Sequence, residues 1–137
     1  MIDARTAPYG ALLLRVVSGA WFLTHAWLKA MVFGMPGAMK YFESVGFPGW
    51  LAYVAVAIEV IGGLGLILGI CVRPIAAVLG LELLVIAFGV HWNYGWLFVA
   101  KGGGWEYPMF WAAAMFALAL TGSGAWSIGP FKKKTPA

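Results

Sequence analysis

Two apolar segments joined by a very short turn occupy residues 50–94, which read WLAYVAVAIEVIGGLGLILGICVRPIAAVLGLELLVIAFGVHWNY. Residues 50–70 and residues 74–94 are each as long as the roughly 20 mainly apolar residues that a helix needs to cross a bilayer. The connection between them, residues 71–73, leaves room only for a reversal of direction. The pattern predicts two antiparallel membrane-spanning helices.

Two further apolar segments, residues 10–33 and residues 107–126, flank this hairpin and have similar lengths. Pro74 and Pro108 fall in the first turns of their segments, where the missing N–H costs little. We therefore predict an all-α fold, an integral membrane four-helix bundle that forms a single domain over residues 1–137.

The composition also indicates a lipid environment, because 63% of the residues are hydrophobic and only 10% are charged. A soluble monomer with this composition would expose far larger apolar patches than such proteins tolerate. The net charge of +4 does not indicate nucleic acid, because the Lys and Arg residues are scattered except at residues 132–134. Cys71 is the single cysteine, which excludes an intrachain disulfide. We expect the bilayer as a partner and no nucleic acid.

The 50–70 segment is rich in glycine. Gly65 and Gly69 are four residues apart, a spacing that lets membrane helices approach closely. We expect close helix packing at these positions.

The connection over residues 34–49 is long enough to hold structure of its own. Its middle, residues 38–45, fits a short interfacial helix with Met39, Phe42 and Val45 facing lipid.

The orientation follows from the Lys and Arg residues near the ends of the segments. One side of the predicted bundle holds Arg5, Arg15, Arg73, Lys132, Lys133 and Lys134, and the other holds Lys29, Lys40 and Lys101. Because positive residues concentrate on the cytoplasmic side, we expect both N and C termini and the 71–73 turn in the cytoplasm. The expected location is the cytoplasmic (inner) membrane of a bacterium or archaeon, as a multi-pass protein.

Arg15, Glu59 and Glu82 are ionisable residues that fall inside the predicted helices, where a charge costs about 2.5–3.5 kcal/mol. A rise of about 1.5 Å per residue puts Arg15 and Glu82 on the cytoplasmic side and Glu59 near the middle. We predict a buried ion-pair network in which Arg15 pairs with one or both carboxylates. The network either fixes the register of the helices or forms part of a proton or substrate path.

A second polar group, His25, Lys29, His91 and Glu106, lies in the outer part of the predicted bundle. His25 and Lys29 share a helix face because they are four residues apart. Their donors suit the carbonyl oxygens of a quinone, whose tail would lie in an apolar pocket between helices. Histidines also suit a proton relay. A metal held by His25, His91 and Glu106 is the weakest alternative, because no helix carries a His pair at ligand spacing.

Several short stretches, in this order and spacing, also carry a family resemblance. They are residues 12–15 (LLLR), His25 with Lys29, residues 42–48 (FESVGFP), Glu59 with Gly62 and Gly63, Leu68 and Gly69 with Arg73, His91, Glu106, and the GSG and WSI of residues 122–128. Through them nearly the whole chain resembles the DoxX family of small four-helix membrane proteins. It departs from the family at Ala26, where glycine is usual, and at Glu82, where an apolar residue is common. No role for Glu82 is therefore carried over.

The resemblance implies a membrane subunit associated with an oxidoreductase or respiratory complex, with quinone as the expected cofactor. Named members are similar to a subunit of thiosulfate:quinone oxidoreductase or associate with terminal quinol oxidases. Whether the chain itself catalyses a reaction is left open, and no Cys-x-x-Cys-His motif for covalent haem is present.

Two alternatives to this function remain. One is a non-catalytic accessory subunit that packs against a larger membrane complex or against copies of itself. The other is a small proton-coupled transporter that would use Arg15, Glu59 and Glu82.

Overall fold

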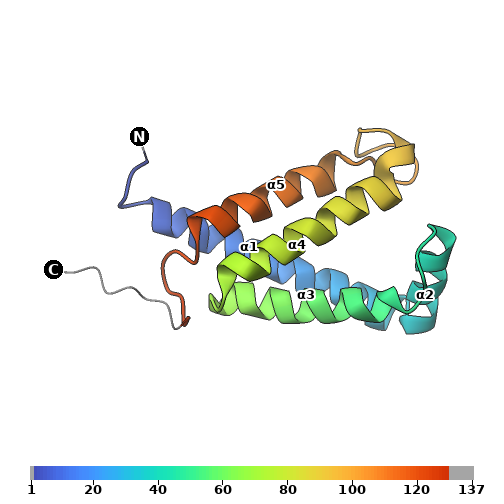
Figure 1. Cartoon of the computed structure of the whole chain (residues 1–137), viewed down its shortest axis with the longest axis horizontal. Coiled ribbons are helices and arrows are strands. Elements are labelled where there is room, and N and C mark those ends of the chain that lie inside the picture. Colours follow the sequence, from blue (N-terminus) through green and yellow to red (C-terminus); the bar gives the residue numbers. More distant parts are fainter. Residues whose placement is uncertain (1, 130–137) are drawn as a thin grey trace.

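The structure, a computed structural model, describes residues 2–129 and is all-helical over that range. Its helices are α1 (Ala7–Trp27), α2 (Met35–Ser44), α3 (Leu51–Leu68), α4 (Val72–Ile86) and α5 (Glu106–Thr121), with π-helical segments η1 (Leu28–Val32) and η2 (Ala87–His91) and a 3₁₀ turn η3 (Trp92–Tyr94) (Figure 1). The all-α prediction is confirmed. Lys132, Lys133 and Lys134, expected as a basic anchor, lie outside the described residues.

Three helical stretches within residues 2–129 are long and apolar enough to cross a membrane: Ala7–Val32, Leu51–Leu68 and Val72–Tyr94. They match the predicted segments at 10–33, 50–70 and 74–94 to within a few residues. The segment predicted at 107–126 forms α5, which has 16 residues and ends at Thr121. It ends there because Gly122 adopts a φ of 90°, which does not continue a right-handed helix.

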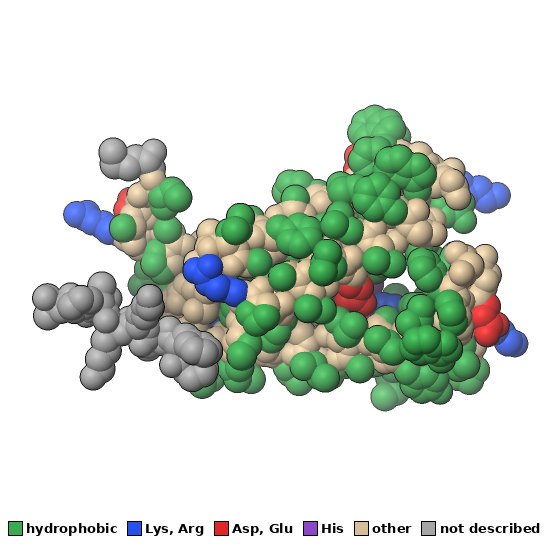
Figure 2. All heavy atoms as spheres, in the orientation of Figure 1, with side chains coloured by type: hydrophobic (Ala, Val, Ile, Leu, Met, Phe, Trp, Pro, Cys, Tyr) green, Lys and Arg blue, Asp and Glu red, His purple; other side chains and the backbone are tan. Residues whose placement is uncertain are grey.

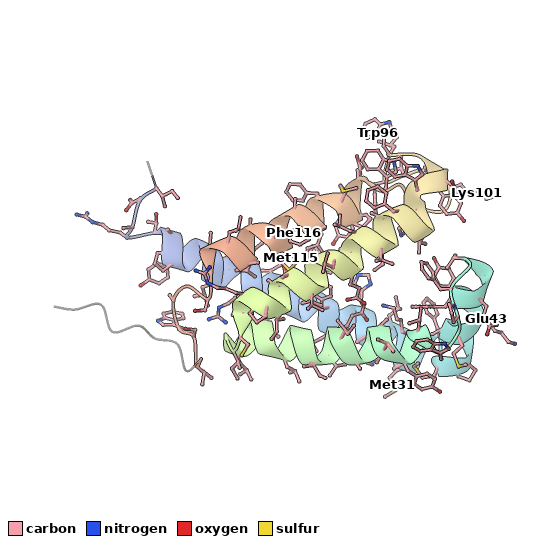
Figure 3. The ribbon with its side chains drawn as sticks, in the orientation of Figure 1. Met31, Glu43, Trp96, Lys101, Met115 and Phe116 are labelled. Atoms are coloured by element: carbon pink, nitrogen blue, oxygen red, sulfur yellow. The ribbon has the colours of Figure 1, made fainter. Side chains whose placement is uncertain are left out.

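The helices pack as two pairs, α1 with α3 and α4 with α5, and the tight turn between α3 and α4 joins the pairs. In Figure 1 the start of α1 and the described segment after α5 lie at one end of the bundle, here named the termini end, and α2 lies at the other, the α2 end. The loop with Trp96 and Lys101 also lies at the α2 end, as does Glu43 on α2 (Figure 3). The two pairs diverge toward the α2 end, so the bundle is widest there (Figure 1).

The interior and the exterior of this bundle are both apolar. Leu79 and Met115 are fully buried between the pairs, whereas Ile61, Phe110 and Leu120 are exposed on the outside. Figure 2 shows hydrophobic side chains over much of the visible face. A surface of this kind is stable against lipid tails, which are as apolar as leucine.

Helices α1 and α3 approach each other closely at two glycines. A Cβ on Gly63 would lie 2.8 Å from the carbonyl oxygen of Gly19, and a Cβ on Gly19 would lie 2.7 Å from that of Gly63. Small residues permit this contact. The close packing expected at Gly65 and Gly69 is confirmed, but with other partners: a Cβ on Gly65 would overlap Ile75 of α4, and a Cβ on Gly69 would lie 2.7 Å from Cα of Ser127. Gly69 also ends α3 with a left-handed φ of 74°.

Arg15 is completely buried near the termini end. Its guanidinium donates to five backbone carbonyl oxygens: Nε to Ser123 at 2.9 Å, Nη1 to Leu66 at 2.8 Å and Ile67 at 2.6 Å, and Nη2 to Ala125 at 2.8 Å and Trp126 at 2.9 Å. A guanidinium has five N–H donors, so every one of them is used. Two acceptors belong to the last turn of α3, where the Leu66 oxygen also accepts from the Gly69 N–H at 3.2 Å, and three belong to the segment after α5.

The predicted pairing of Arg15 with Glu59 or Glu82 is wrong. Side chains on a helix tilt toward its N-terminus, and α1 begins at the termini end, so Arg15 leans away from both carboxylates. The carbonyls at the C-terminal end of α3 carry partial negative charge. These carbonyls, and not a carboxylate, are therefore the acceptors for the Arg15 guanidinium.

Replacing Arg15 with methionine should lower the free energy of unfolding by roughly 3 kcal/mol, because several buried carbonyl oxygens would lose their donors. The free energy of unfolding of Arg15→Lys should lie between that of Arg15→Met and that of the parent chain, since an ammonium group has three donors instead of five. Circular dichroism of the purified protein in detergent, titrated with a denaturing detergent, measures the change. Arg5→Met is the control, because Arg5 is exposed at the same end. Equal stability of Arg15→Met and the parent chain would contradict the role given to Arg15.

Replacing Gly63 with alanine should destabilise the fold by about 1–3 kcal/mol, because the added methyl overlaps the Gly19 carbonyl and Leu23. Gly10→Ala is a matched control in α1, since a Cβ there meets nothing within 4 Å. That change should leave stability unaltered or raised by less than about 1 kcal/mol. The same unfolding titration compares the two variants, and equal effects would rule out the close contact.

Candidate functional site

A cavity of about 520 Å³ lies between the two helix pairs near the α2 end. Its lining is mainly apolar and includes Ala55 and Ile58 of α3, Leu83 of α4, Phe22 of α1 and Trp111 of α5. Figure 2 shows a hollow on the visible face, with acidic and basic side-chain atoms inside it. The site is thus an apolar chamber with a polar patch.

Helix α2 closes one side of this cavity. The predicted short helix at 38–45 is confirmed as Met35–Ser44. The expected lipid-facing orientation is wrong for Phe42 and Val45, which line the cavity together with Phe47. The reason is that α2 lies across the end of the bundle where the pairs diverge (Figure 1), so its apolar face covers the interior.

The centre of the polar patch is an ion pair between Lys29 and Glu59. Lys29 Nζ donates to Glu59 Oε1 at 2.7 Å and to Oε2 at 2.9 Å, and the Glu59 side chain is 3% exposed. Lys29 follows α1, which runs toward the α2 end, and Glu59 belongs to α3, which runs away from it. Because both side chains tilt toward their helix N-termini, they lean toward each other along the bundle axis.

Glu82 of α4 lines the same cavity, opposite this ion pair. Its Oε2 atom is buried and has no hydrogen-bond partner among the described residues. Buried polar atoms without a partner are uncommon in folded proteins and call for a specific explanation.

His91 lines the cavity and is held by the loop that follows it. Its Nδ1 lies 3.2 Å from the carbonyl oxygen of Gly102 and 3.0 Å from that of Gly103. Two carbonyl acceptors require Nδ1 to carry the hydrogen, so Nε2 of the neutral imidazole is an acceptor. Gly103 has a φ of 76°, a backbone conformation that glycine adopts without strain.

Lys29 and His91 both lie in π-helical segments, η1 and η2. A π-helical turn inside an α-helix shifts the side chains that follow it and is frequent at functional sites. Neither segment is visible in the hydrophobic pattern, which continues through both of them.

Tyr41 of α2 adds a phenol at the rim of the cavity. Burial, and then the nearby Tyr94, raise the pKa of Tyr41. Its hydroxyl therefore stays protonated at neutral pH and can donate a hydrogen bond.

The predicted group of His25, Lys29, His91 and Glu106 is only partly brought together. His25, Lys29 and His91 line the cavity. Glu106 does not, because its Oε1 accepts a hydrogen bond from the backbone N–H of Phe98 at 2.9 Å and so closes its own loop. Glu59 takes its place in the polar patch.

The predicted network of Arg15, Glu59 and Glu82 is separated in the same way. Both carboxylates belong to the cavity and Arg15 belongs to the termini end. Side-chain direction on antiparallel helices is the signal that could have divided the two groups from sequence.

A metal site is not assembled from the residues proposed for it. Within residues 2–129 there is no group of three His, Cys, Asp or Glu side chains that could hold a metal ion. Glu106, the required third ligand beside His25 and His91, is engaged by the loop.

The arrangement can bind a small molecule with a polar head and an apolar body. The polar patch holds an ammonium, two carboxyl groups, an imidazole acceptor and a phenol. His25 and Tyr107 add a second imidazole and a second phenol to the lining, and the remaining walls are apolar. A ligand would therefore be oriented with its polar end against Lys29, Glu82 and His91.

The comparisons with known proteins agree with a membrane protein of this type. The DoxX family model matches residues 10–92. "Putative oxidoreductase CatD" of Bacillus subtilis (strain 168) is 34% identical over 122 residues, which cover 89% of this chain and 86% of that protein. "Inner membrane protein YqjF" of Escherichia coli (strain K12) is 30% identical over 124 residues, which cover 87% and 88%. No solved structure gives a significant match. The chain therefore belongs to the DoxX family.

Proposed function

We propose that the chain is a membrane subunit associated with an oxidoreductase or respiratory complex, and that it binds a quinone in the cavity at the α2 end. The observation that carries the proposal is the cavity itself, which joins apolar walls to a polar patch of Lys29, Glu59, Glu82 and His91. A purely structural accessory subunit would have no need of such a chamber.

The opening of the cavity favours a ligand that arrives from lipid. Val54 of α3 and Val78, Leu81 and Val85 of α4 line the cavity and are 40%, 48%, 57% and 53% exposed. The mouth thus lies on the outer face between α3 and α4, where hydrocarbon tails would contact the protein. A quinone dissolved in the bilayer could enter sideways without crossing water, and its tail could remain in this opening.

The polar patch suits both redox forms of a quinone headgroup. The oxidised form has two carbonyl oxygens, which accept hydrogen bonds, and Lys29 and Tyr41 are donors. The reduced form has hydroxyl groups, and Nε2 of His91 is an acceptor. Binding of both forms is what a subunit that exchanges quinone and quinol requires.

The relatives support the wider setting of this function. One relative is named an oxidoreductase and another an inner membrane protein. We extend both descriptions to this chain as proposals: a role beside an oxidoreductase, and a place in the cytoplasmic membrane of a bacterium or archaeon.

We also propose that α5 crosses the bilayer as a fourth span and that both termini are cytoplasmic. Helix α5 packs along α4 over its length. Its 16 residues give a rise of about 24 Å, and Trp105 just before the helix and Tyr107 in its first turn can lie in the membrane interface.

Quinone binding can be measured with menadione, a quinone without a long tail, on the purified protein in mild detergent. Menadione should quench tryptophan fluorescence saturably, because Trp111 lines the cavity. Ala55→Phe should weaken the affinity at least about tenfold by filling the chamber, and His91→Phe should weaken binding of the quinol more than that of the quinone.

Glu106→Gln is the control for this experiment, since residue 106 lies outside the cavity and a glutamine oxygen can still accept from Phe98. Its affinity should equal that of the parent chain. If Ala55→Phe binds menadione as tightly as Glu106→Gln does, the cavity is not a quinone site.

The native cysteine allows the orientation to be tested in spheroplasts. Cys71 is exposed in the turn at the termini end, so a membrane-impermeant maleimide should label it only after permeabilisation. In a Cys71→Ser background, Lys101→Cys should be labelled in intact spheroplasts and Thr121→Cys only after permeabilisation. Labelling of Cys71 from outside would reverse the orientation, and external labelling of Thr121→Cys alone would remove the fourth span.

A further inference from the structure

We propose that Glu82 carries a proton and donates a hydrogen bond from its carboxyl group to an oxygen atom of the ligand in the cavity. This inference rests on the proposed function, because it assigns a further ligand-binding residue to the same site. The ligand class it selects is a molecule with a neutral oxygen acceptor, such as the carbonyl of a quinone head.

The cavity lining carries more acidic than basic side chains. Within the described residues, Lys29 is the one lysine or arginine in the lining, and Glu59 and Glu82 are the two acidic residues. Lys29 is bonded to both oxygens of Glu59, at 2.7 and 2.9 Å. One cation therefore neutralises one carboxylate, and it is committed to Glu59.

An ionised Glu82 in this cavity would cost free energy. A second carboxylate beside Glu59, in an apolar chamber within the membrane, would meet both a desolvation penalty and a like charge. An isolated buried charge is among the most expensive groups in a protein interior, and taking up a proton removes the cost. Arg15 is bonded to five carbonyls at the other end, so among the described residues Lys29 is the one Lys or Arg at the cavity.

The surroundings of Glu82 determine which group can accept a hydrogen bond from its proton. Glu82 Oε2 is buried without a partner in the described part of the chain. The other titratable groups that face the cavity are His25, Tyr41, His91 and Tyr107. His91 already donates through Nδ1 to its own loop. Within residues 2–129 no group is hydrogen-bonded to Glu82 Oε2, the acceptor Nε2 of His91 included. An O–H on Glu82 is therefore available to donate to a ligand oxygen.

The arrangement also explains why Glu59 and Glu82 play different parts although both are glutamates in spanning helices. Lys29 reaches Glu59 because the two side chains lean toward each other from antiparallel helices. Glu82 comes from the second helix pair, across the cavity. Glu59 therefore holds Lys29 in place, and Glu82 is left to bind the ligand.

Infrared spectroscopy of the protein in detergent tests the protonation of Glu82 without any ligand. The parent chain should show the carbonyl-stretch band of a protonated carboxylic acid at neutral pH, and Glu82→Gln should lose it. Glu106→Gln should keep the band. In Glu59→Gln the band should disappear, because Lys29 becomes free to pair with Glu82. Absence of the band from the parent chain, or its persistence in Glu82→Gln, would overturn the proposal.

Menadione affinity tests the donor role separately. Glu82→Gln retains N–H donors and should bind within about threefold of the parent chain, whereas Glu82→Leu has no donor and should bind about tenfold more weakly. Leucine is apolar and of similar size, so the chamber should still fold, and circular dichroism checks this.

The two proposals fail in different ways. If the parent chain does not bind menadione but the infrared band belongs to Glu82, the quinone function is wrong and the protonated carboxyl group stands. If menadione binds the parent chain and Glu82→Leu equally well, the quinone site stands and the donor role of Glu82 is overturned.

Discussion

The rest of the bundle depends on the hydrogen bonds that the buried Arg15 makes to backbone carbonyl oxygens. A guanidinium without a carboxylate partner is stable inside a membrane protein only if every donor is satisfied, and here five carbonyl oxygens do this. These carbonyls come from the end of α3 and from the segment after α5. Arg15 on α1 thereby joins three parts of the chain at the termini end. Gly69 leaves the space for it, since a Cβ there would lie 3.1 Å from the guanidinium carbon.

Closure at one end allows the helix pairs to diverge at the other. The α3–α4 turn and the Arg15 contacts fix the termini end, while α2 and the 95–105 loop separate the pairs at the α2 end (Figure 1). The cavity follows from that divergence. Its polar patch then combines one cation with two carboxyl groups, an imbalance that leaves Glu82 Oε2 without a hydrogen-bond partner within residues 2–129. The Arg15 contacts and the cavity proposed to bind a ligand therefore lie at opposite ends of one small bundle.

Much of the fold could be predicted because its physics is local. Long apolar runs, the three-residue turn and the short helix before α3 are properties of neighbouring residues. The site could be predicted only in part. Depth along the helices correctly brought His25, Lys29 and His91 to one end, but depth alone assigned Glu59 and Glu82 to Arg15. The tilt of side chains toward the helix N-terminus separates Arg15 from the two carboxylates. It moves the side chains of Arg15 and Lys29 toward the termini end relative to their Cα atoms.

The sequence by itself determined that this chain is helical, belongs in lipid and carries more buried ionisable residues than an anchor needs, because hydrophobicity and helical rise act residue by residue. Only the tertiary structure decided which ionisable groups meet. Pairing depends on the relative rotation and direction of helices that are far apart in the chain, and the π-helical segments at Lys29 and His91 change that rotation without a mark in the hydrophobic pattern. The tertiary structure also turned Glu106 into a loop contact and α2 into a wall of the cavity.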